Sequence, residues 1–382
     1  MPSSARAVAC LGLLAAAAVA FAQTPEAEIE APDDSARLVE VLREAHVRTK
    51  AVGTQYAISV DGQTVVTAAF GHARLEDQVP VTGDTRFLAM SVTKAFVGAA
   101  LVKAASAELV DLDVPVRTYL PDLPLVDHPA ITLRTLAAHT AGLPHLNHPD
   151  RKAFYVERYT TARDALEAVA EQRDRTHDPG TEYRYSSGNY NAIAAALEAV
   201  SGQPFPAYLE AAILAPMGLT GTRMLDVLDP TPNLARNYTL YDAWDYHDLD
   251  SPQVVPTWDY SFNMGGGGMI STARDLETFG RAFLKPGFFS AEELELFRRP
   301  IAPDSESSWS FGWILGETES GRSRLRISGA TIGVMASLLV MPDEQVVAAA
   351  LTNSWGENAR DGEVIFGVVE RVVESLLDSA TD

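Results

Sequence analysis

The chain has 382 residues and a formal net charge of −21, from 30 Lys and Arg residues against 51 Asp and Glu residues. Hydrophobic residues make up 47% of it and charged residues 21%, so it can bury a large core and is not a disordered chain. A field of this sign repels phosphate backbones, which excludes nucleic acid as a partner and argues against binding to anionic membranes.

The first 22 residues have the pattern of a secretory signal. Arg6 is their only charge, and an apolar stretch rich in Leu and Ala follows from Ala7 to Phe21. Ala20 and Ala22 are the small residues that a signal peptidase reads, so we place cleavage after Ala22. The stretch is too short and too rich in alanine for a membrane span. We therefore expect a periplasmic or secreted protein with no integral membrane segment after cleavage.

The only cysteine, Cys10, lies inside this segment. A lipid-modified Cys10 would need an apolar run before it, and only three residues separate it from Arg6. The mature chain is therefore expected to fold without disulfides, and it lacks a cysteine nucleophile or a thiolate metal site.

After the signal, residues 23–34 form a short acidic leader without a pattern. Apolar positions at helical spacing then predict a helix from Ser35 to about Lys50. Two runs typical of strands follow, at 55–60 and 64–70, and the dipeptide Asp61-Gly62 between them indicates a hairpin.

The middle of the chain is predicted to be mainly helical. A long run at 86–110 is nearly free of helix breakers, and loops rich in Pro, His, Asn and Asp separate the later helices. Those helices are expected near 131–139, 161–172, 189–200, 206–215 and 272–284. Before the last of them, Gly265–Gly268 indicates a turn or a tight approach between backbones.

Strand patterns return near the end of the chain, before a final amphipathic helix at about 360–378. The strands are expected at 310–315, 325–328, 335–341 and 346–351. The absence of βαβ alternation disfavours a doubly wound parallel sheet. We expect an α+β fold of the α/β sandwich type, in which both chain ends build one antiparallel sheet flanked by helices. In this single domain, 35–382, the α/β part comprises about 35–85 and 265–382, and a mostly helical insert comprises about 86–264.

The sharpest candidate for chemistry is Ser91-Val92-Thr93-Lys94. A spacing of three on a helix places the side chains of Ser91 and Lys94 on one face. A serine hydroxyl is a poor nucleophile until a base takes its proton. An amine can do so when burial lowers its pKa from about 10.4 toward about 7–8, and the neighbours Met90 and Phe96 make burial of Lys94 plausible. The motif alone also fits a surface Ser and Lys on an amphipathic helix.

Two further stretches are candidates for the same site. Tyr185 lies just before a predicted helix, where nearby cations can lower the pKa of its phenol and let it act as a base. Alternatively, it is a tyrosine packed at the start of that helix.

The segment Ile327–Thr331 is a strand with small residues, whose backbone N–H groups suit an oxyanion hole or strand-like substrate docking. The chain has no G-x-S-x-G, P-loop or H-E-x-x-H motif.

Together these three motifs have the order and separation found in the class C β-lactamase-like serine hydrolases, which the chain resembles from about residue 35 to 375. That family includes class C β-lactamases, penicillin-binding D,D-carboxypeptidases, D-aminopeptidases and related esterases. Several other stretches carry the resemblance: Thr85–Phe87, Leu109–Asp113, His139–Pro144, Tyr183–Tyr190, Gly267–Thr272 and Met341–Asp343.

The resemblance implies a role for each matching residue. Ser91 would form an acyl-enzyme, Lys94 would help to deprotonate it, and Tyr185 would be the partner base and the proton shuttle to the leaving group. The identity of the acylation base, Lys94 or Tyr185, stays open. The backbone N–H groups of Ser91 and Ala330 would form the oxyanion hole. The neighbouring residues expected at the substrate are Ser187, Ile327, Ser328 and Gly329.

At two positions the chain departs from the family pattern. Ser187 stands where the family usually has Asn, and it cannot present an amide to a substrate carbonyl. Ile327 stands where the family usually has Lys or His, and it cannot bind a substrate carboxylate. Arg324 and Arg326 are near in sequence, but strand alternation puts Arg326 on the face opposite Ile327. These differences favour a neutral ester, amide or peptide without a free carboxylate beside the scissile bond.

The predicted function is therefore hydrolysis through a Ser91 acyl-enzyme, with no cofactor, no metal and a monomeric chain. One alternative is a β-lactamase, a D-Ala-D-Ala carboxypeptidase or a D-aminopeptidase. Another is a non-catalytic relative that binds peptidoglycan fragments or a protein. The cluster His139, His145, His148 and Asp150 does not have a known metal-site spacing, and we interpret His139 as a structural residue after its helix.

Overall fold

The computed structural model describes residues 29–30, 36–145, 158–170, 175–229, 231–242, 247–302, 308–355 and 365–379. The predicted signal at 1–22 lies outside these residues. Within them, no helix combines the length and the apolar character that crossing a membrane requires.

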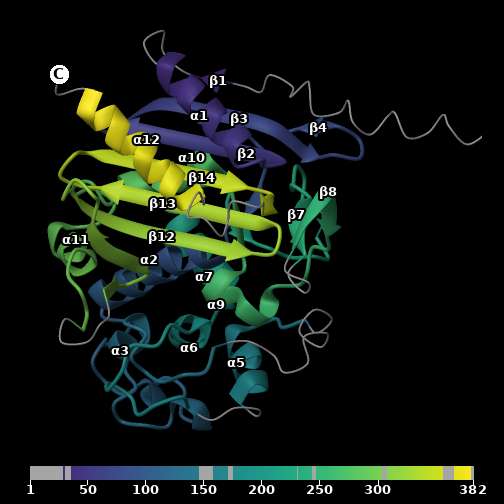
Figure 1. The fold of residues 1–382 in the computed structure, drawn as a ribbon. Coiled ribbons are helices and arrows are strands. Elements are labelled where there is room, and N and C mark those ends of the chain that lie inside the picture. The colour runs from purple at the N-terminus through teal and green to yellow at the C-terminus, as the bar shows by residue number, and fades with distance from the viewer. Residues whose placement is uncertain are drawn as a thin grey trace, which may run out of the picture.

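A nine-stranded antiparallel sheet forms the upper part of the molecule in Figure 1. Its strands follow the order β1-β3-β2-β14-β13-β12-β11-β10, and β4 pairs with β3. Their bounds are β1 Ile29–Glu30, β2 Gly53–Val60, β3 Gln63–Arg74, β4 Val79–Pro80, β10 Trp309–Ser310, β11 Trp313–Glu317, β12 Ser323–Thr331, β13 Val334–Met341 and β14 Val346–Thr352. The expected sheet of both chain ends is confirmed, because β14 pairs with β2.

The hairpin expected at Asp61-Gly62 is also confirmed. Both residues have positive φ angles, 53° and 76°, which is the geometry that a two-residue turn between twisted strands requires. The strands at the centre of the sheet are buried on both faces, because helices cover both of them. This is why β13 and β14 are apolar along nearly their whole length and do not alternate with polar residues.

On one face of the sheet lie the first and last helices, α1 (Ala36–Arg48) and α12 (Ile365–Ser379) (Figure 1). They bury a separate hydrophobic cluster against β2, β3, β13 and β14. On the other face lie α10 (Ala273–Arg281) and α2 (Thr93–Ser106), which join the larger core. The two ends of the chain thus close one face, and the site described below lies on the other.

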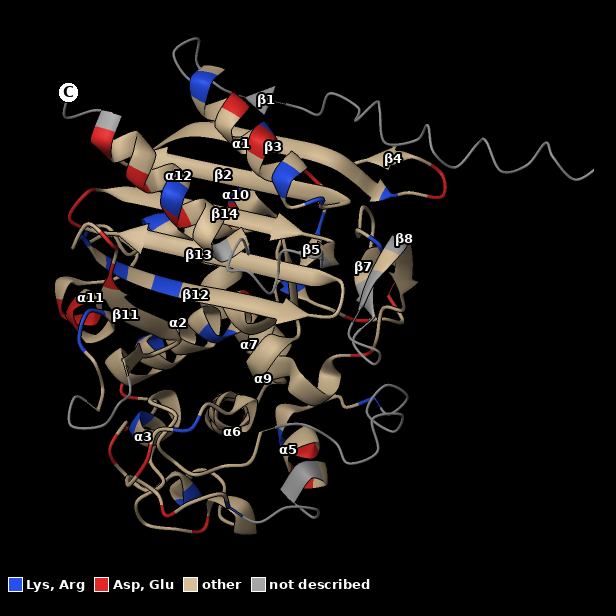
Figure 2. Cartoon of the chain, viewed as in Figure 1, with Lys and Arg blue, Asp and Glu red and all other residues tan. Residues whose placement is uncertain are grey.

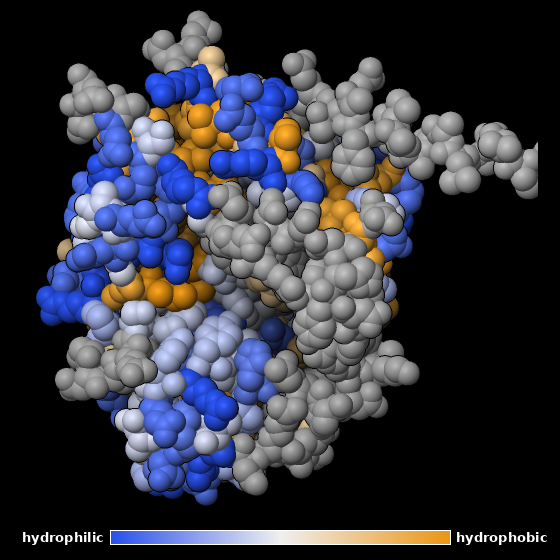
Figure 3. Space-filling view, in the orientation of Figure 1, coloured by the Kyte–Doolittle hydropathy of each residue, from blue (hydrophilic) through white to orange (hydrophobic). Residues whose placement is uncertain are grey.

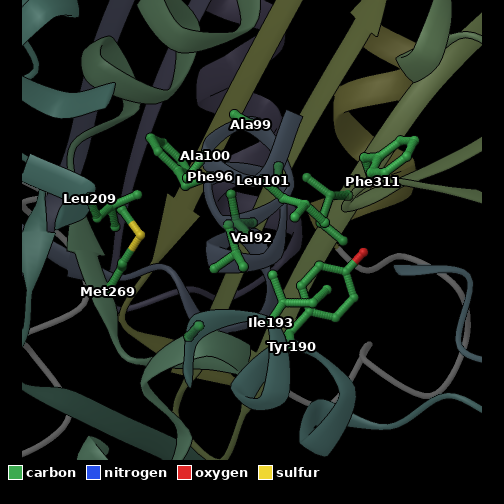
Figure 4. Packing of buried hydrophobic residues seen from close by; sticks show 14 of the residues in the cluster. Val92, Phe96, Ala99, Ala100, Leu101, Tyr190, Ile193, Leu209, Met269 and Phe311 are labelled. Carbon is green, nitrogen blue, oxygen red and sulfur yellow. The ribbon is translucent and has the colours of Figure 1, made fainter. Parts of the chain in front are cut away.

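The helical part lies below the sheet in Figure 1 and packs around α2. Its other helices are α3 Leu133–Ala137, α5 Ala162–Ala170, α6 Ser187–Ser201, α7 Phe205–Leu209, α8 Ala215–Met217 and α9 Met264–Gly267. Figure 4 shows Val92, directly before α2, close to Ile193 of α6, with Phe96 of α2 and Tyr190 of α6 in the same cluster. This packing holds together the two helices at whose starts the candidate catalytic residues lie.

Several elements differ from the sequence expectation. The helix predicted over 86–110 begins only at Thr93, because Phe87–Leu88 form β5 and Met90–Val92 form a 3₁₀ turn.

Short helical turns also occur at Val116–Thr118, Pro124–Val126 and Ser261–Asn263, and a π-helical turn occurs at Glu210–Leu214 within the helix expected at 206–215. The sequence also did not predict β1, which lies within the stretch expected to be a leader without a pattern, or β4. The other elements that it did not predict are β6 Arg223–Met224, β7 Asn237–Asp242, β8 His247–Val255, β9 Met269–Ser271, β15 Ser354–Trp355 and α11 Ala291–Phe297. Tertiary pairing decides these short elements: β5, β6 and β9 form one small sheet, and β7, β8 and β15 form another.

Candidate active site

Ser91 lies in the 3₁₀ turn that opens α2, directly after a strained residue. Met90 has a φ of 47°, which is uncommon for a bulky side chain. The end of β12 packs tightly against this turn, since a β-carbon on Gly329 would lie 2.3 Å from the Ala89 carbonyl oxygen and 2.7 Å from the Ser91 nitrogen. The close approach requires glycine at 329, and it brings the exposed Ala330 next to the backbone of Ser91.

The edge of β12 that meets Ser91 is open at this point. β11 pairs with Ser323–Arg326 only, so the residues after Arg326 have no strand partner on that edge in the described part of the chain. On the face drawn in Figure 3, the surface is hollowed between the sheet and the helical part. The strand end thus has an unpaired edge in the described part of the chain, and Gly329 on it lies beside the backbone of the candidate nucleophile.

The three candidate catalytic side chains form one hydrogen-bonded network. Ser91 Oγ lies 2.7 Å from the hydroxyl of Tyr185 and accepts a hydrogen bond of 3.2 Å from Lys94 Nζ. Lys94 Nζ also donates to Ser187 Oγ at 3.2 Å and to the carbonyl oxygen of Gly266 at 2.5 Å. Lys94 comes from α2 and Ser187 from the first turn of α6, so the packing of these helices sets the distances.

Lys94 is fully buried, as its apolar neighbours in the sequence suggested. Burial lowers the pKa of its ammonium group, and the nearby Tyr185 opposes this effect. The acceptors at Ser91, Ser187 and Gly266 are uncharged, so these three hydrogen bonds hold the amine without a carboxylate. Such a cation is easier to deprotonate than an exposed or salt-bridged lysine.

For Lys94 burial decides the direction of the pKa shift, whereas for Tyr185 nearby charge and hydrogen bonds decide it. Burial raises the pKa of its phenol, but the charge of Lys94 and hydrogen bonds from Lys94, Ser91 and Ser187 together outweigh burial and lower the pKa below its ordinary value. The Lys94 Nζ atom lies 5.0 Å from the centre of the Tyr185 ring. Lys94 and Tyr185 therefore act on each other as a coupled acid–base pair at the Ser91 hydroxyl.

Two histidines lie against the Tyr185 ring and bind the residues that follow it. His139 is buried and accepts hydrogen bonds from the Ser186 backbone N–H at 3.2 Å and the Asn189 side-chain amide at 3.0 Å. Its ring lies 4.7 Å from the Tyr185 ring, and burial with the charge of Lys94 lowers its pKa well below the usual value. His145 accepts from the Ser187 backbone N–H at 3.1 Å. These contacts fit the interpretation of His139 as a structural residue, because they join it to the segment that follows Tyr185.

No group of three or more metal-binding side chains occurs among the residues that the structure describes. His148 and Asp150 of the histidine-rich loop lie outside those residues.

Ile327 and its neighbours occupy opposite faces of β12. The Ile327 side chain is 1% exposed and belongs to the larger core. Arg324 and Arg326 lie on the other face, where both pair with Glu370 of α12. The alternation predicted for Ile327 and Arg326 is therefore confirmed. Ser328 is partly buried and Ala330 is exposed near the turn of Ser91.

The glycine run makes the tight approach that the sequence indicated, and it also reaches the site. A β-carbon on Gly265 would lie 2.3 Å from the Tyr190 carbonyl oxygen, which explains the glycine there. Gly266 contributes the carbonyl oxygen that binds Lys94. The sequence analysis missed this contribution, because a backbone acceptor leaves no side-chain signature.

Comparison with known proteins agrees with this geometry. The family model described as Beta-lactamase matches residues 36–370. The human serine beta-lactamase-like protein LACTB, mitochondrial, is 24% identical, with 81% of this chain and 73% of that protein covered. The putative penicillin-binding protein PbpX of Bacillus subtilis is 25% identical, with 76% of this chain and 68% of that protein covered.

Solved structures share the fold at low sequence identity. The D-amino acid amidase of Ochrobactrum anthropi, complexed with L-phenylalanine, has a TM-score of 0.77 and 22% identity over 90% of this chain and 99% of that one. EstCE1, a hydrolase with promiscuous acyltransferase activity, has a TM-score of 0.72 and 23% identity over 88% of this chain and 97% of that one. With the family model covering residues 36–370, this chain belongs to the β-lactamase family.

Proposed function

We propose that this protein is a serine hydrolase that cleaves neutral esters or amides through an acyl-enzyme on Ser91. The observation that carries the proposal is the convergence of two bases on one oxygen. Ser91 Oγ contacts both Tyr185 and Lys94, and both of these groups have lowered pKa values. A base with a lowered pKa beside a serine hydroxyl is the requirement for a serine nucleophile.

The proposed reaction has two steps. Ser91 Oγ attacks the substrate carbonyl carbon while its proton passes to the Tyr185–Lys94 pair. The carbonyl oxygen becomes an oxyanion, which the N–H groups of Ser91 and Ala330 stabilise. The leaving alcohol or amine then takes the proton from Tyr185 and departs. A water molecule gives a proton to the same pair and attacks the Ser91 ester, which releases a carboxylic acid and restores the hydroxyl.

The preference for neutral substrates rests on the surroundings of the site. Ile327 is buried and apolar, and the arginines of β12 are held by Glu370 on the far face of the strand. The net charge of −21 adds a long-range repulsion of anions. The structural neighbours named as an amidase and a hydrolase with acyltransferase activity support this substrate class over a carboxylate-bearing β-lactam or D-Ala-D-Ala peptide.

A fluorophosphonate probe followed by mass spectrometry of the labelled peptide tests the nucleophile. We expect the label on Ser91, and we expect Ser91→Ala to lose both labelling and turnover. Ser106→Ala, at the far end of the same helix, is the matched control. Undiminished hydrolysis by folded Ser91→Ala would reject the mechanism. A wild-type protein that neither labels nor turns over any substrate would favour the alternative of a non-catalytic binding protein.

A substrate panel tests the specificity. We expect short acyl esters to have a higher kcat/KM than nitrocefin or D-amino-acid peptides. If the wild-type protein prefers the β-lactam or the D-Ala-D-Ala peptide, then the substrate carboxylate is recognised elsewhere, and the β-lactamase or carboxypeptidase alternative replaces our proposal.

We further propose that the protein is secreted or periplasmic, on the basis of the signal pattern at 1–22. We also propose that the mature protein is a monomer. Fractionation of the expressing cell, N-terminal sequencing and light scattering of the purified protein test these points. A chain that keeps residues 1–22 in the cytoplasm would contradict the localisation.

A further inference from the structure

Trp309 joins the edge of the large sheet to the segment that carries Tyr185. It lies in β10, the last strand of the nine-stranded sheet, which pairs with β11. Its carbonyl oxygen accepts a hydrogen bond from the Ile301 N–H at 3.1 Å. The next residue, Ser310, donates its hydroxyl to the carbonyl oxygen of Leu296 in α11 at 2.7 Å. The backbone of Trp309 is therefore held by both the sheet and α11.

The side chain of Trp309 packs against the helical part. The indole is 3% exposed, and its Nε1–H donates a hydrogen bond of 2.9 Å to the hydroxyl of Tyr183. The centre of the Trp309 ring lies 5.6 Å from that of Tyr185 and 4.4 Å from that of His139. One side chain of the sheet thus contacts Tyr185 itself, the residue two positions before it and the histidine packed on its ring.

The ring of Tyr185 depends on such contacts for its position. Residues 183–186 lie outside helices and strands, directly before α6. In the described part of the chain, three aromatic rings lie against the Tyr185 ring, those of His139, His145 and Trp309. The two histidines belong to the same helical part as Tyr185, so their contacts do not fix it relative to the sheet. Of the three rings, that of Trp309 comes from the sheet.

The position of the phenol relative to the sheet matters because the candidate nucleophile is packed on the sheet. Ser91 lies in the turn that opens α2, and this turn packs against Gly329 at the end of β12. The 2.7 Å contact between Ser91 Oγ and the Tyr185 hydroxyl therefore joins a turn held by the sheet to the segment before α6. Proton transfer requires a distance of this size, and a displacement of about 1 Å can lower a rate by about 10²-fold.

We infer that Trp309 is a positioning residue, which holds the Tyr185 phenol at the Ser91 hydroxyl through its hydrogen bond to Tyr183 and its contact with the Tyr185 ring. The inference rests on the proposed function of Ser91 and Tyr185. Trp309 takes no part in the proton transfer itself, because an indole N–H is a donor only and this one is bound to Tyr183. Its effect is therefore on kcat through Tyr185, and KM stays nearly unchanged.

The test removes the hydrogen bond from either side. Trp309→Phe keeps an aromatic ring and loses the donor, and Tyr183→Phe keeps the ring and loses the acceptor. We expect each variant to lower kcat for a neutral ester by about threefold to tenfold, the size of one neutral hydrogen bond, with KM within about twofold of wild type. The double variant should lose no more than the larger single loss, because the same bond is absent from all three proteins.

Trp313→Phe on the neighbouring strand β11 is the matched control. The Trp313 ring packs on Phe279 and Phe283, and its Nε1 has no hydrogen-bond partner among the described residues. The substitution therefore removes an indole from the same part of the sheet without removing a hydrogen bond to the segment of Tyr185. It should keep kcat within about twofold of wild type.

A background variant asks whether Trp309 acts through Tyr185. Tyr185→Phe lacks the hydroxyl that is positioned, so adding Trp309→Phe should lower its residual kcat by less than about twofold. An equal further loss in that background would show that Trp309 only supports the fold and would overturn the inference. A wild-type kcat in folded Tyr183→Phe, a change at an exposed residue, would overturn it as well.

Fluorophosphonate labelling and turnover of the wild-type protein, measured in parallel, separate these results from a failure of the proposed function. A wild-type protein that is neither labelled on Ser91 nor active would reject the proposed function. A labelled, active wild-type protein with unaffected variants would reject only the role of Trp309.

Discussion

The two faces of the nine-stranded sheet differ in the groups that bind their cations, which are partly buried arginines on one face and a fully buried lysine on the other. On the face of α1 and α12, Arg324 and Arg326 pair with Glu370, while Arg322 pairs with Glu374 at 2.9 Å (Figure 2). On the face of α2, Lys94 is more deeply buried than these arginines, yet it donates to uncharged oxygens only in its three described hydrogen bonds.

The difference shows which cation is structural and which is available for chemistry. A cation matched by a carboxylate keeps its proton, because the negative charge stabilises the charged form. A buried cation held by neutral groups has a lowered pKa and can exchange a proton with its neighbours. The ion pairs along α12 thus attach a helix to the sheet, while the lysine at Ser91 is held in a state that costs stability and suits the acid–base role that we propose for it.

The largest expected effect comes from removing the base pair at Ser91. Lys94→Ala and Tyr185→Phe should each lower kcat by about 10² to 10⁴, the usual contribution of a positioned acid or base. The double variant should lose much less than the product of the two, because both groups act on the same proton. Steady-state kinetics of the three variants measures this.

Lys103→Ala is the control for Lys94, because Lys103 lies on the same helix but pairs with Glu293 at 2.9 Å. It should keep kcat. If the losses at Lys94 and Tyr185 simply multiplied, the two groups would not share a proton and the contrast between the two faces would lose its catalytic meaning.

The pH dependence of kcat/KM tests the same difference between the lysine at Ser91 and the arginines on the opposite face of the sheet. Activity requires the Tyr185–Lys94 pair to have lost one proton, so kcat/KM should fall about tenfold per pH unit below the apparent pKa of the pair. Ser187 is one of the groups that lower the pKa of Tyr185. Ser187→Ala should therefore move the acidic limb of the profile to higher pH.

Arg324→Ala, on the opposite face, should leave the limb where it is. A limb that moves equally in both variants would mean that general electrostatics, and not the local hydrogen bonds, set the pKa of the pair.

Stability at acidic pH tests a buried base on the α1 face. Burial and the nearby Arg43 lower the pKa of His46 from 6.5 to about 4, and its ring packs on Phe70. In the unfolded chain the same group binds its proton near 6.5. The unfolded state therefore binds more protons between these values, and folding stability falls as the pH drops from about 6.5 to about 4, by about 3 kcal/mol at most from this residue.

His46→Gln should flatten that part of the curve of unfolding free energy against pH. Denaturant unfolding at several pH values measures it, with His128→Gln as the control on a different part of the surface. The same steep decline in both variants would show that other groups cause the acid sensitivity.

The smallest expected effect comes from the ion pairs of β12 and α12. Arg324→Ala should lower the free energy of unfolding by about 1–3 kcal/mol, because it leaves Glu370 largely buried without this partner. The Arg324→Leu, Glu370→Leu double variant should recover part of the loss, since it removes both charges of the closer pair and leaves only the partly exposed Arg326 without Glu370. Thermal unfolding with parallel kinetics measures both, and kcat/KM should stay within about twofold of wild type. A large loss of activity would mean that this face is coupled to the site.

Much of the fold could be predicted from local patterns. The hairpin at Asp61-Gly62, the strands of the sheet and the helices α1, α6, α10 and α12 each carry their own periodicity or turn signal. The start of α2 could not be predicted, because the helical pattern of 86–110 does not reveal the positive φ of Met90, which lies where β12 packs against the chain at Gly329. The strands β5, β6 and β9 were missed for a similar reason: each is two or three residues long and exists by pairing with the others.

The amino-acid sequence by itself determined the chemical identity of the candidate site. Each of its motifs depends only on residue type and local spacing, so the sequence alone reveals it. These motifs are a serine and a lysine three residues apart, a tyrosine at a helix start and a strand of small residues. Only the tertiary structure decided how these groups act. The buried Lys94 and the carbonyl oxygen of Gly266 that binds it lie 172 residues apart along the chain. Their effect on proton affinity depends on distance and desolvation, which packing creates and which no local pattern records.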